Sequence, residues 1–342
     1  MLLETLIAVT ALGTFVKAAR PENVTICDWY TPLIIGEPNS PDSQQKLMQR
    51  ITHTFILGNY TTPNVGIKVA GVAAPGNFSG HEVNILNYFT GAYYSSNGYN
   101  NTSTGIAKNF LDDGGATALL ADKPANTKTS NQYALLTHVY QYFGEFYGCS
   151  EQGTGDFPKY KGVASMYEVH KFMKSDPYES GYFNEQIVLA AKSLGFEQAD
   201  CDFTLKALEA TFGNRCSPAA PVIPASAGPQ LQAICVSENC PLDPNATCSA
   251  YPDEGFVPFP EIANATLAGA VVKENDTSAA TTASPSGTGS PAASGSASGS
   301  STASGSAATS TGGASTLEVS SALKVIGTLI TVVGAGLFIA PL

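Results

Sequence analysis

Every residue from Thr277 to Thr316 is Ser, Thr, Ala, Gly or Pro. This segment has no apolar side chain large enough to build a core, so it cannot fold by itself. Its hydroxyl groups are natural sites for O-linked glycans, which would extend it into a stalk; without glycans it would be a flexible linker. We therefore assign residues 266–315 to a disordered stalk and expect the folded part of the chain to precede it.

The segment after the stalk predicts a lipid anchor. Residues 325–342 are apolar, a polar spacer lies at 316–324, and small residues stand before it at 313–315. This order is typical of a signal for attachment of a glycosylphosphatidylinositol (GPI) lipid. We expect Gly313, within a few positions, to carry the lipid and residues 316–342 to be removed. The alternative is a tail-anchored single membrane span.

The start of the chain predicts secretion. Residues 2–16 are almost wholly apolar and small residues follow, which is typical of a signal peptide that would end at Ala18. A short buried helix is the alternative. Together with the GPI signal, the signal peptide (1–18) predicts a location on the outer face of the plasma membrane or in the cell wall. The expected partners are the membrane, through the GPI lipid, and a cell-wall glycan.

Charge and glycosylation patterns agree with this location. The chain of 342 residues has 17 Lys plus Arg against 28 Asp plus Glu, for a net charge of −11. A nucleic-acid binder needs a basic face, so this class is excluded. Acceptor sequences for N-glycans, Asn-x-Ser/Thr, begin at Asn23, Asn59, Asn77, Asn100, Asn101, Asn245, Asn264 and Asn275.

Seven cysteines should mostly form disulfides in this oxidising compartment. No pair has CxxC spacing, so a zinc site is unsupported. The last three cysteines crowd a Pro-rich extension, 217–265, and we expect bridges there that tie it to the domain, with Cys216 as one candidate partner. Because seven is odd, one thiol should stay free, and Cys201 is our candidate. The cysteines are Cys27, Cys149, Cys201, Cys216, Cys235, Cys240 and Cys248.

Residues 19–216 predict a mainly α domain with long irregular loops. Residues 65–74 alternate in polarity and predict a short strand or hairpin. Residues 81–89 predict a short helix, and 91–129 a long loop with one helical turn near Phe110. Apolar residues recur with helical period over 43–57, 130–147, 164–174, 176–195 and 198–212.

Among the four histidines, only His170 lies squarely in an apolar helix face, with Met166 and Met173. A histidine in this position is usually a packed core residue, and a metal or haem ligand is the alternative. We expect His53 at the rim of its helix and His138 on the wetter side of its own. The sequence has no GxSxG, HExxH, EF-hand or phosphate-loop motif, so it predicts no common enzyme class.

Residues 133–213 resemble the second half of the truncated globins, in particular group I. The resemblance is carried, in order, by YALLTHVYQYFGEFYGC, FPKYKG, MYEVHKF, NEQIVLAAKSLGF and QADCDFTLKALEATFG. In that family a long aromatic-rich helix precedes a glycine-bearing loop and a short helix with a Met-x-x-x-His signature. The histidine of this signature is the proximal haem ligand, and it matches His170. The layout of the whole chain is similar to that of fungal GPI-anchored surface proteins.

The resemblance implies a globin-like fold that binds haem or a small gas, with His170 as the axial metal ligand. Such a ring should enter a dry pocket with its second nitrogen held by a backbone carbonyl. Residues 20–130 are longer than the family needs, and the distal tyrosine is open among Tyr30, Tyr60 and Tyr88. One alternative is a non-enzymatic surface-interaction protein without cofactor. Another is a haem peroxidase-like enzyme, for which His138 is the sole distal candidate.

Overall fold

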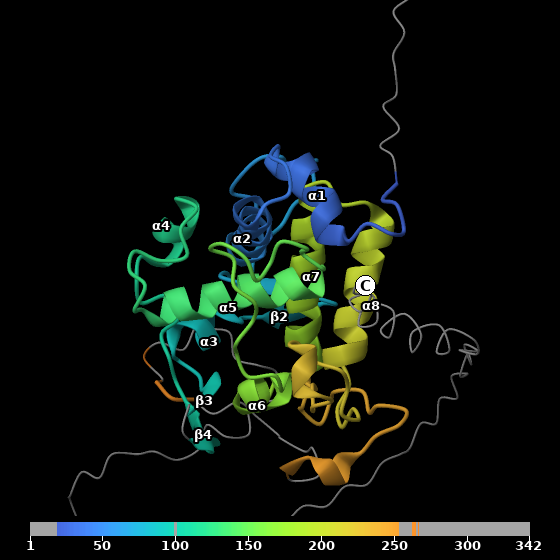
Figure 1. Ribbon diagram of the computed structural model, residues 1–342. Coiled ribbons are helices and arrows are strands. Elements are labelled where there is room, and N and C mark those ends of the chain that lie inside the picture. Colours follow the sequence, from blue (N-terminus) through green and yellow to red (C-terminus); the bar gives the residue numbers. More distant parts are fainter. Residues whose placement is uncertain (1–18, 99–100, 253–261, 265, 267–342) are drawn as a thin grey trace, which may run out of the picture. The chain divides into compact units, whose positions relative to one another are not determined.

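The computed structural model describes residues 19–98, 101–252, 262–264 and 266 (Figure 1). The expected signal peptide, the GPI signal with Gly313, and the sequons at Asn100 and Asn275 lie outside these residues, as does the stalk beyond residue 266. Within the described ranges, no helix has the length and apolar character needed to cross a membrane.

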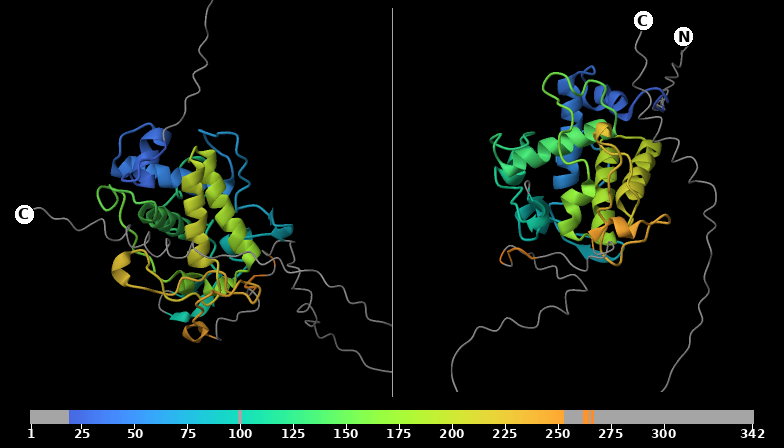
Figure 2. Two further views of the ribbon diagram at one scale, coloured as in Figure 1. Left: turned by 90° about the vertical axis from the view of Figure 1, so that its right-hand side faces the viewer. Right: turned by 60° about the horizontal axis from the view of Figure 1, so that its bottom comes forward.

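The described residues are mainly helical, as the sequence predicts. Helix α2 lies against α1, α5 and α7, and α7 in turn lies beside α8 (Figure 1; Figure 2, left). The interior between these helices is one hydrophobic cluster that is rich in aromatic rings. The five long helices are α1 (Ile26–Ile35), α2 (Pro41–Leu57), α5 (Asn131–Phe146), α7 (Pro177–Ser193) and α8 (Gln198–Phe212).

The remaining elements are short. The helices are α3 (Leu86–Thr90), α4 (Gly115–Leu120) and α6 (Met166–His170), with 3-10 turns at Lys171–Met173 (η1), Ala225–Ala227 (η2) and Cys248–Ala250 (η3). Two antiparallel hairpins pair β1 (Gly76–Phe78) with β2 (His81–Val83), and β3 (Ser96–Gly98) with β4 (Asn101–Ile106).

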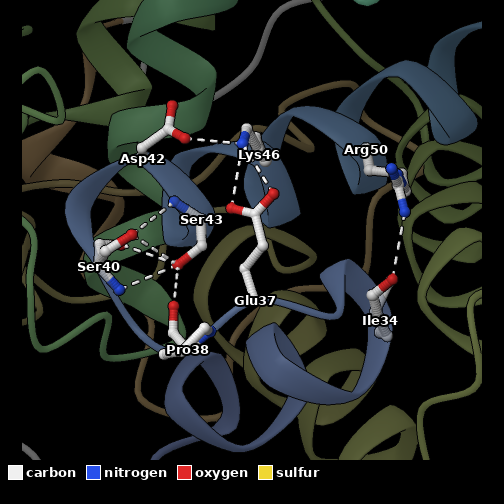
Figure 3. A network of polar contacts seen from close by, with 8 residues as sticks. All are labelled: Ile34, Glu37, Pro38, Ser40, Asp42, Ser43, Lys46 and Arg50. Carbon is white, nitrogen blue, oxygen red and sulfur yellow. Dashed lines mark hydrogen bonds and ion pairs between the residues drawn. The ribbon is translucent and has the colours of Figure 1, made fainter.

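The start of α2 is fixed by local polar contacts (Figure 3). The backbone N–H of Ser43 donates to the Ser40 hydroxyl (3.1 Å), and the backbone N–H of Ser40 donates to the Ser43 hydroxyl (2.9 Å). This reciprocal capping satisfies N–H groups that the first helical turn cannot pair internally. Lys46 binds the carboxylates of Asp42 (2.7 Å) and Glu37 (3.1 Å) one turn later. The helix therefore begins two residues before the periodic pattern predicts.

The hairpins correct two sequence expectations. Residues 65–74, which alternate in polarity, contain no strand, and the expected helix over 81–89 is β2 followed by α3. The hairpin forms later because Ser79 and Gly80 both have positive φ, 52° and 86°. Two successive residues of this kind make the tight turn that suits a right-handed twisted hairpin. The position of this turn depends on the backbone conformation of Ser79 and Gly80, which the periodicity of the sequence does not show.

The region 91–129 is also more ordered than expected. It contains β3, β4 and α4, and the helical turn lies at 115–120 instead of near Phe110. The backbone N–H of Phe110 instead donates to the Phe89 carbonyl (2.7 Å), which ties this loop to α3. Helix α1 has no counterpart among the expected helices.

Three disulfides hold the chain: Cys27–Cys149, Cys216–Cys248 and Cys235–Cys240. Cys216–Cys248 joins the end of the helical domain to the extension, which confirms the expected link and the candidate partner. Cys201 is a buried free thiol, as predicted. The first disulfide ties α1 to the residues that follow α5, a pairing that cysteine spacing left open.

Candidate functional site

His170 is the last residue of α6, and its ring is half-buried. Ser165 caps this short helix by accepting a hydrogen bond from the Glu168 N–H (3.2 Å). The His170 Nδ1 atom lies 2.8 Å from the backbone carbonyl oxygen of Met166. A carbonyl oxygen can only accept, so Nδ1 carries the proton and Nε2 has a lone pair. A backbone carbonyl thus holds the second nitrogen in the way that an axial ligand requires.

The His170 ring is kept neutral by its surroundings. Burial lowers the pKa of the imidazole, and the hydrogen bond to Met166 partly opposes this shift. No hydrogen-bond partner for Nε2 is found in the part of the chain that the structure describes. A neutral imidazole with an unshared Nε2 lone pair is the form that binds metals.

The segment after α3 lies directly on this helix. Strand β3 contacts α6 and η1, and the Asn97 side-chain amide donates to the Glu168 carbonyl oxygen (2.7 Å). A Cβ atom at Gly105 would lie 2.9 Å from the ring of Phe172, so β4 and η1 approach closely. The β3–β4 hairpin therefore packs against the element that carries His170.

The three candidate distal tyrosines lie in different parts of the molecule and have different hydrogen-bond partners. The Tyr88 hydroxyl lies 3.0 Å from the backbone carbonyl oxygen of Met173, three residues beyond His170, and 3.1 Å from a carboxylate oxygen of Glu179. Tyr30 and Tyr60 both donate to carboxylates, each at 2.8 Å. Tyr88 thus lies against the α6–η1 segment, and its ring is buried there.

Of the other three histidines, His53 is buried, His81 is half-buried and His138 is exposed. His53 was expected at the rim, but its side chain is fully buried, with Nδ1 3.0 Å from the Leu119 carbonyl and Nε2 2.6 Å from the Tyr140 hydroxyl. It is buried because four elements, α1, α4, α5 and α7, surround α2. His138 is exposed on α5, with its ring edge toward Tyr160 (5.9 Å). His81 stacks on a ring of α7 at 3.6 Å.

A pocket of about 160 Å³ lies on another part of the molecule, formed by Phe78 of β1 and by side chains of α7 and α8. His170 does not line it. Among the described residues, no three His, Cys, Asp or Glu side chains are grouped so that they could hold a metal.

The candidate glycosylation sites lie on the surface wherever their side chains are described. The Asn101 backbone belongs to β4, but its side chain is outside the described set. The exposed acceptors are Asn23, Asn59, Asn77, Asn245 and Asn264.

Comparison of the chain with protein-family models, curated proteins and solved structures found no match.

Proposed function

We propose that this protein is an N-glycosylated, GPI-anchored protein of the outer cell surface whose helical domain holds haem or a small gas through His170. The observation that carries the haem proposal is the 2.8 Å hydrogen bond from His170 Nδ1 to the Met166 carbonyl oxygen. It leaves Nε2 as the ligating atom of a neutral ring. The order α5, α6, α7, α8 is consistent with the truncated-globin resemblance and supports a globin-like fold as part of this proposal.

Each residue at the site has a limited role. His170 would coordinate the iron through Nε2, and the Met166 carbonyl would fix the ring orientation and increase its basicity. Bound haem would supply an iron position that a small gas can occupy. The coordinating nitrogen, Nε2 of His170, thus suits haem, whereas the pocket in the described part of the chain lies elsewhere, beside β1, α7 and α8.

The proposed location rests on chemistry rather than on the helical fold. Three disulfides favour an oxidising compartment, and the five described sequon asparagines are exposed to solvent. Both features are expected of a secreted glycoprotein.

A second candidate is a cofactor-free surface-interaction protein that binds a cell-wall glycan. The close packing of β3 on α6, and of Tyr88 on η1, favours it, because these contacts surround the segment that carries His170 with protein groups. In this case His170 is a packed core residue. The peroxidase-like alternative needs a distal acid–base pair, and its candidate, His138, is exposed on α5.

An absorption spectrum tests the proposal. The full chain is expressed in a secreting eukaryotic host and released with a GPI-cleaving phospholipase, and its spectrum is recorded before and after addition of haem. We expect a Soret band that is lost in His170→Ala and retained in His138→Ala. A folded protein without a Soret band, with His170→Ala indistinguishable from wild type, would contradict haem binding and support the cofactor-free surface-interaction protein. Failure of release by phospholipase would contradict the anchor separately, and peroxide turnover would indicate the enzyme.

A further inference from the structure

The outer faces of α7 and α8 form an apolar pocket that the proposed haem site does not use. Gly181, Glu185, Val188 and Leu189 lie on one stripe of α7, at helical spacings of three and four residues. Leu205 and Glu209 provide the facing wall from α8, and Phe78 of β1 adds an aromatic ring. The pocket is therefore built by three elements whose relative positions are fixed by the core.

Gly181 makes the aromatic wall possible. A Cβ atom at this position would collide with the ring of Phe78, so the absence of a side chain lets the ring lie directly on α7. The cross-strand neighbour of Phe78 is His81, which stacks on Tyr178 of α7 at a centroid distance of 3.6 Å. This stacking holds the β1–β2 hairpin, and with it the ring of Phe78, against the helix.

The volume of the pocket sets the size of an occupant. At about 160 Å³, it is close to the size of an engineered apolar cavity of about 150 Å³ that binds benzene. One six-membered ring or a short alkyl group would fill it. The rest of a ligand would extend to the open side.

The charged residues at the pocket determine which charge on a ligand it would favour. Glu185 and Glu209 both line it, and neither forms an ion pair with any residue that the structure describes. The Glu185 carboxylate receives only a long contact of 3.4 Å from the neighbouring Gln186 amide. Two carboxylates beside an apolar pocket favour an occupant that combines an apolar body with a positive charge. The net charge of −11 adds attraction in the same direction.

We propose that this pocket binds a small organic ammonium ion with an apolar body, the body filling the space between Leu205 and Phe78 and the charge lying between Glu185 and Glu209. The site is independent of His170. It is a binding site with no chemical step.

The test compares a cation with its neutral counterpart. Benzyltrimethylammonium and benzyl alcohol are titrated separately into the glycosylated, secreted protein, and binding is followed by calorimetry or NMR shifts. We expect the cation to bind about threefold to tenfold more tightly, since two partly exposed carboxylates contribute modestly. The double variant Glu185→Gln/Glu209→Gln should remove this preference, and Leu205→Trp should weaken both ligands by filling the pocket.

Two controls make the outcome specific. Glu22→Gln, at an exposed carboxylate before α1, should leave the preference unchanged, and His170→Ala should leave binding of both ligands unchanged. Equal affinity for the two ligands, or a preference that survives the double variant, would overturn the assignment of the charge. No saturable binding of either ligand would overturn the site.

Discussion

The side chains of His53 on α2 and Tyr140 on α5 are joined by a hydrogen bond of 2.6 Å inside the protein, where both are almost completely shielded from water. His53 Nδ1 donates to the Leu119 carbonyl oxygen at 3.0 Å, so Nε2 accepts from the Tyr140 hydroxyl. This chain of polar groups links α2 and α5 to the last turn of α4, where Leu119 lies. All of its members are paired, which is the condition for a polar network to be stable in a core.

The first prediction concerns pH. Burial lowers the pKa of His53 to about 4 from its ordinary value of 6.5. Between these values the unfolded chain binds the proton and the folded protein does not, so the free energy of unfolding rises with pH over this window and its contribution is lost as pH falls toward 4. We expect a difference of about 3 kcal/mol. Urea unfolding of wild type and His53→Gln from pH 4 to 7 measures it; parallel curves would contradict the assignment to His53.

The second prediction concerns Tyr140. Tyr140→Phe removes the hydroxyl and leaves His53 Nε2 without its partner in the interior. The free energy of unfolding at pH 7 should fall by about 1–3 kcal/mol. Tyr133→Phe is the matched control, because this half-buried residue lies in the first turn of the same helix. Equal losses in the two variants would show that the hydrogen bond to His53 has no stabilising effect.

The third prediction compares two disulfides. Cys27–Cys149 joins residues separated by 122 positions, whereas Cys235–Cys240 spans 5. If loop entropy in the unfolded chain dominates, replacing the first pair by alanine should cost about 5 kcal/mol and the second about 2 kcal/mol. Thermal or urea unfolding of the two double variants measures the difference. A larger loss for Cys235–Cys240 would show that local constraint in the extension dominates.

The fourth prediction concerns Gly144 in α5. A Cβ atom here would lie 2.5 Å from the Gln152 side-chain oxygen and 2.6 Å from the Phe157 ring, both buried. Gly144→Ala should therefore destabilise the protein by about 1–3 kcal/mol, although alanine favours a helix by about 1 kcal/mol. The control is Ala134→Gly at an exposed site of the same helix, where only helix propensity changes. A stabilised Gly144→Ala would show that Gln152 and Phe157 move aside easily.

Helix positions were largely predictable from the sequence because their signals are local. Ser130, Asp176 and the glycines after the helices mark boundaries that the structure places within two or three residues. Helix α1 is not predicted because Pro32 lies inside it, which argues against a helix although Thr25 and Gly36 cap its two ends. The β1–β2 hairpin was misplaced because its turn depends on positive φ at Ser79, which has no reliable sequence signature.

At the candidate site, too, the local features could be predicted from the sequence and the contacts between distant segments could not. His170 was singled out from the apolar face of its own helix, and its bond to Met166 is local, four residues back. The position of the β3–β4 hairpin on α6 could not be read from periodicity, since it joins segments about seventy residues apart, as in the Asn97–Glu168 contact. Away from this site, the ion pair of Asp200 with Arg20 also joins residues that are far apart, at a sequence separation of 180.

The sequence by itself determined the mainly helical class, the presence of one cysteine without a partner and the expectations of secretion and anchoring, because period, composition and parity are properties of the chain alone. The tertiary structure decided that His53 is buried, which cysteines pair and that Cys201 is the one left free, and which segment lies beside His170. These features depend on contacts between distant elements, and the free energy of such contacts comes from burial that no local pattern encodes.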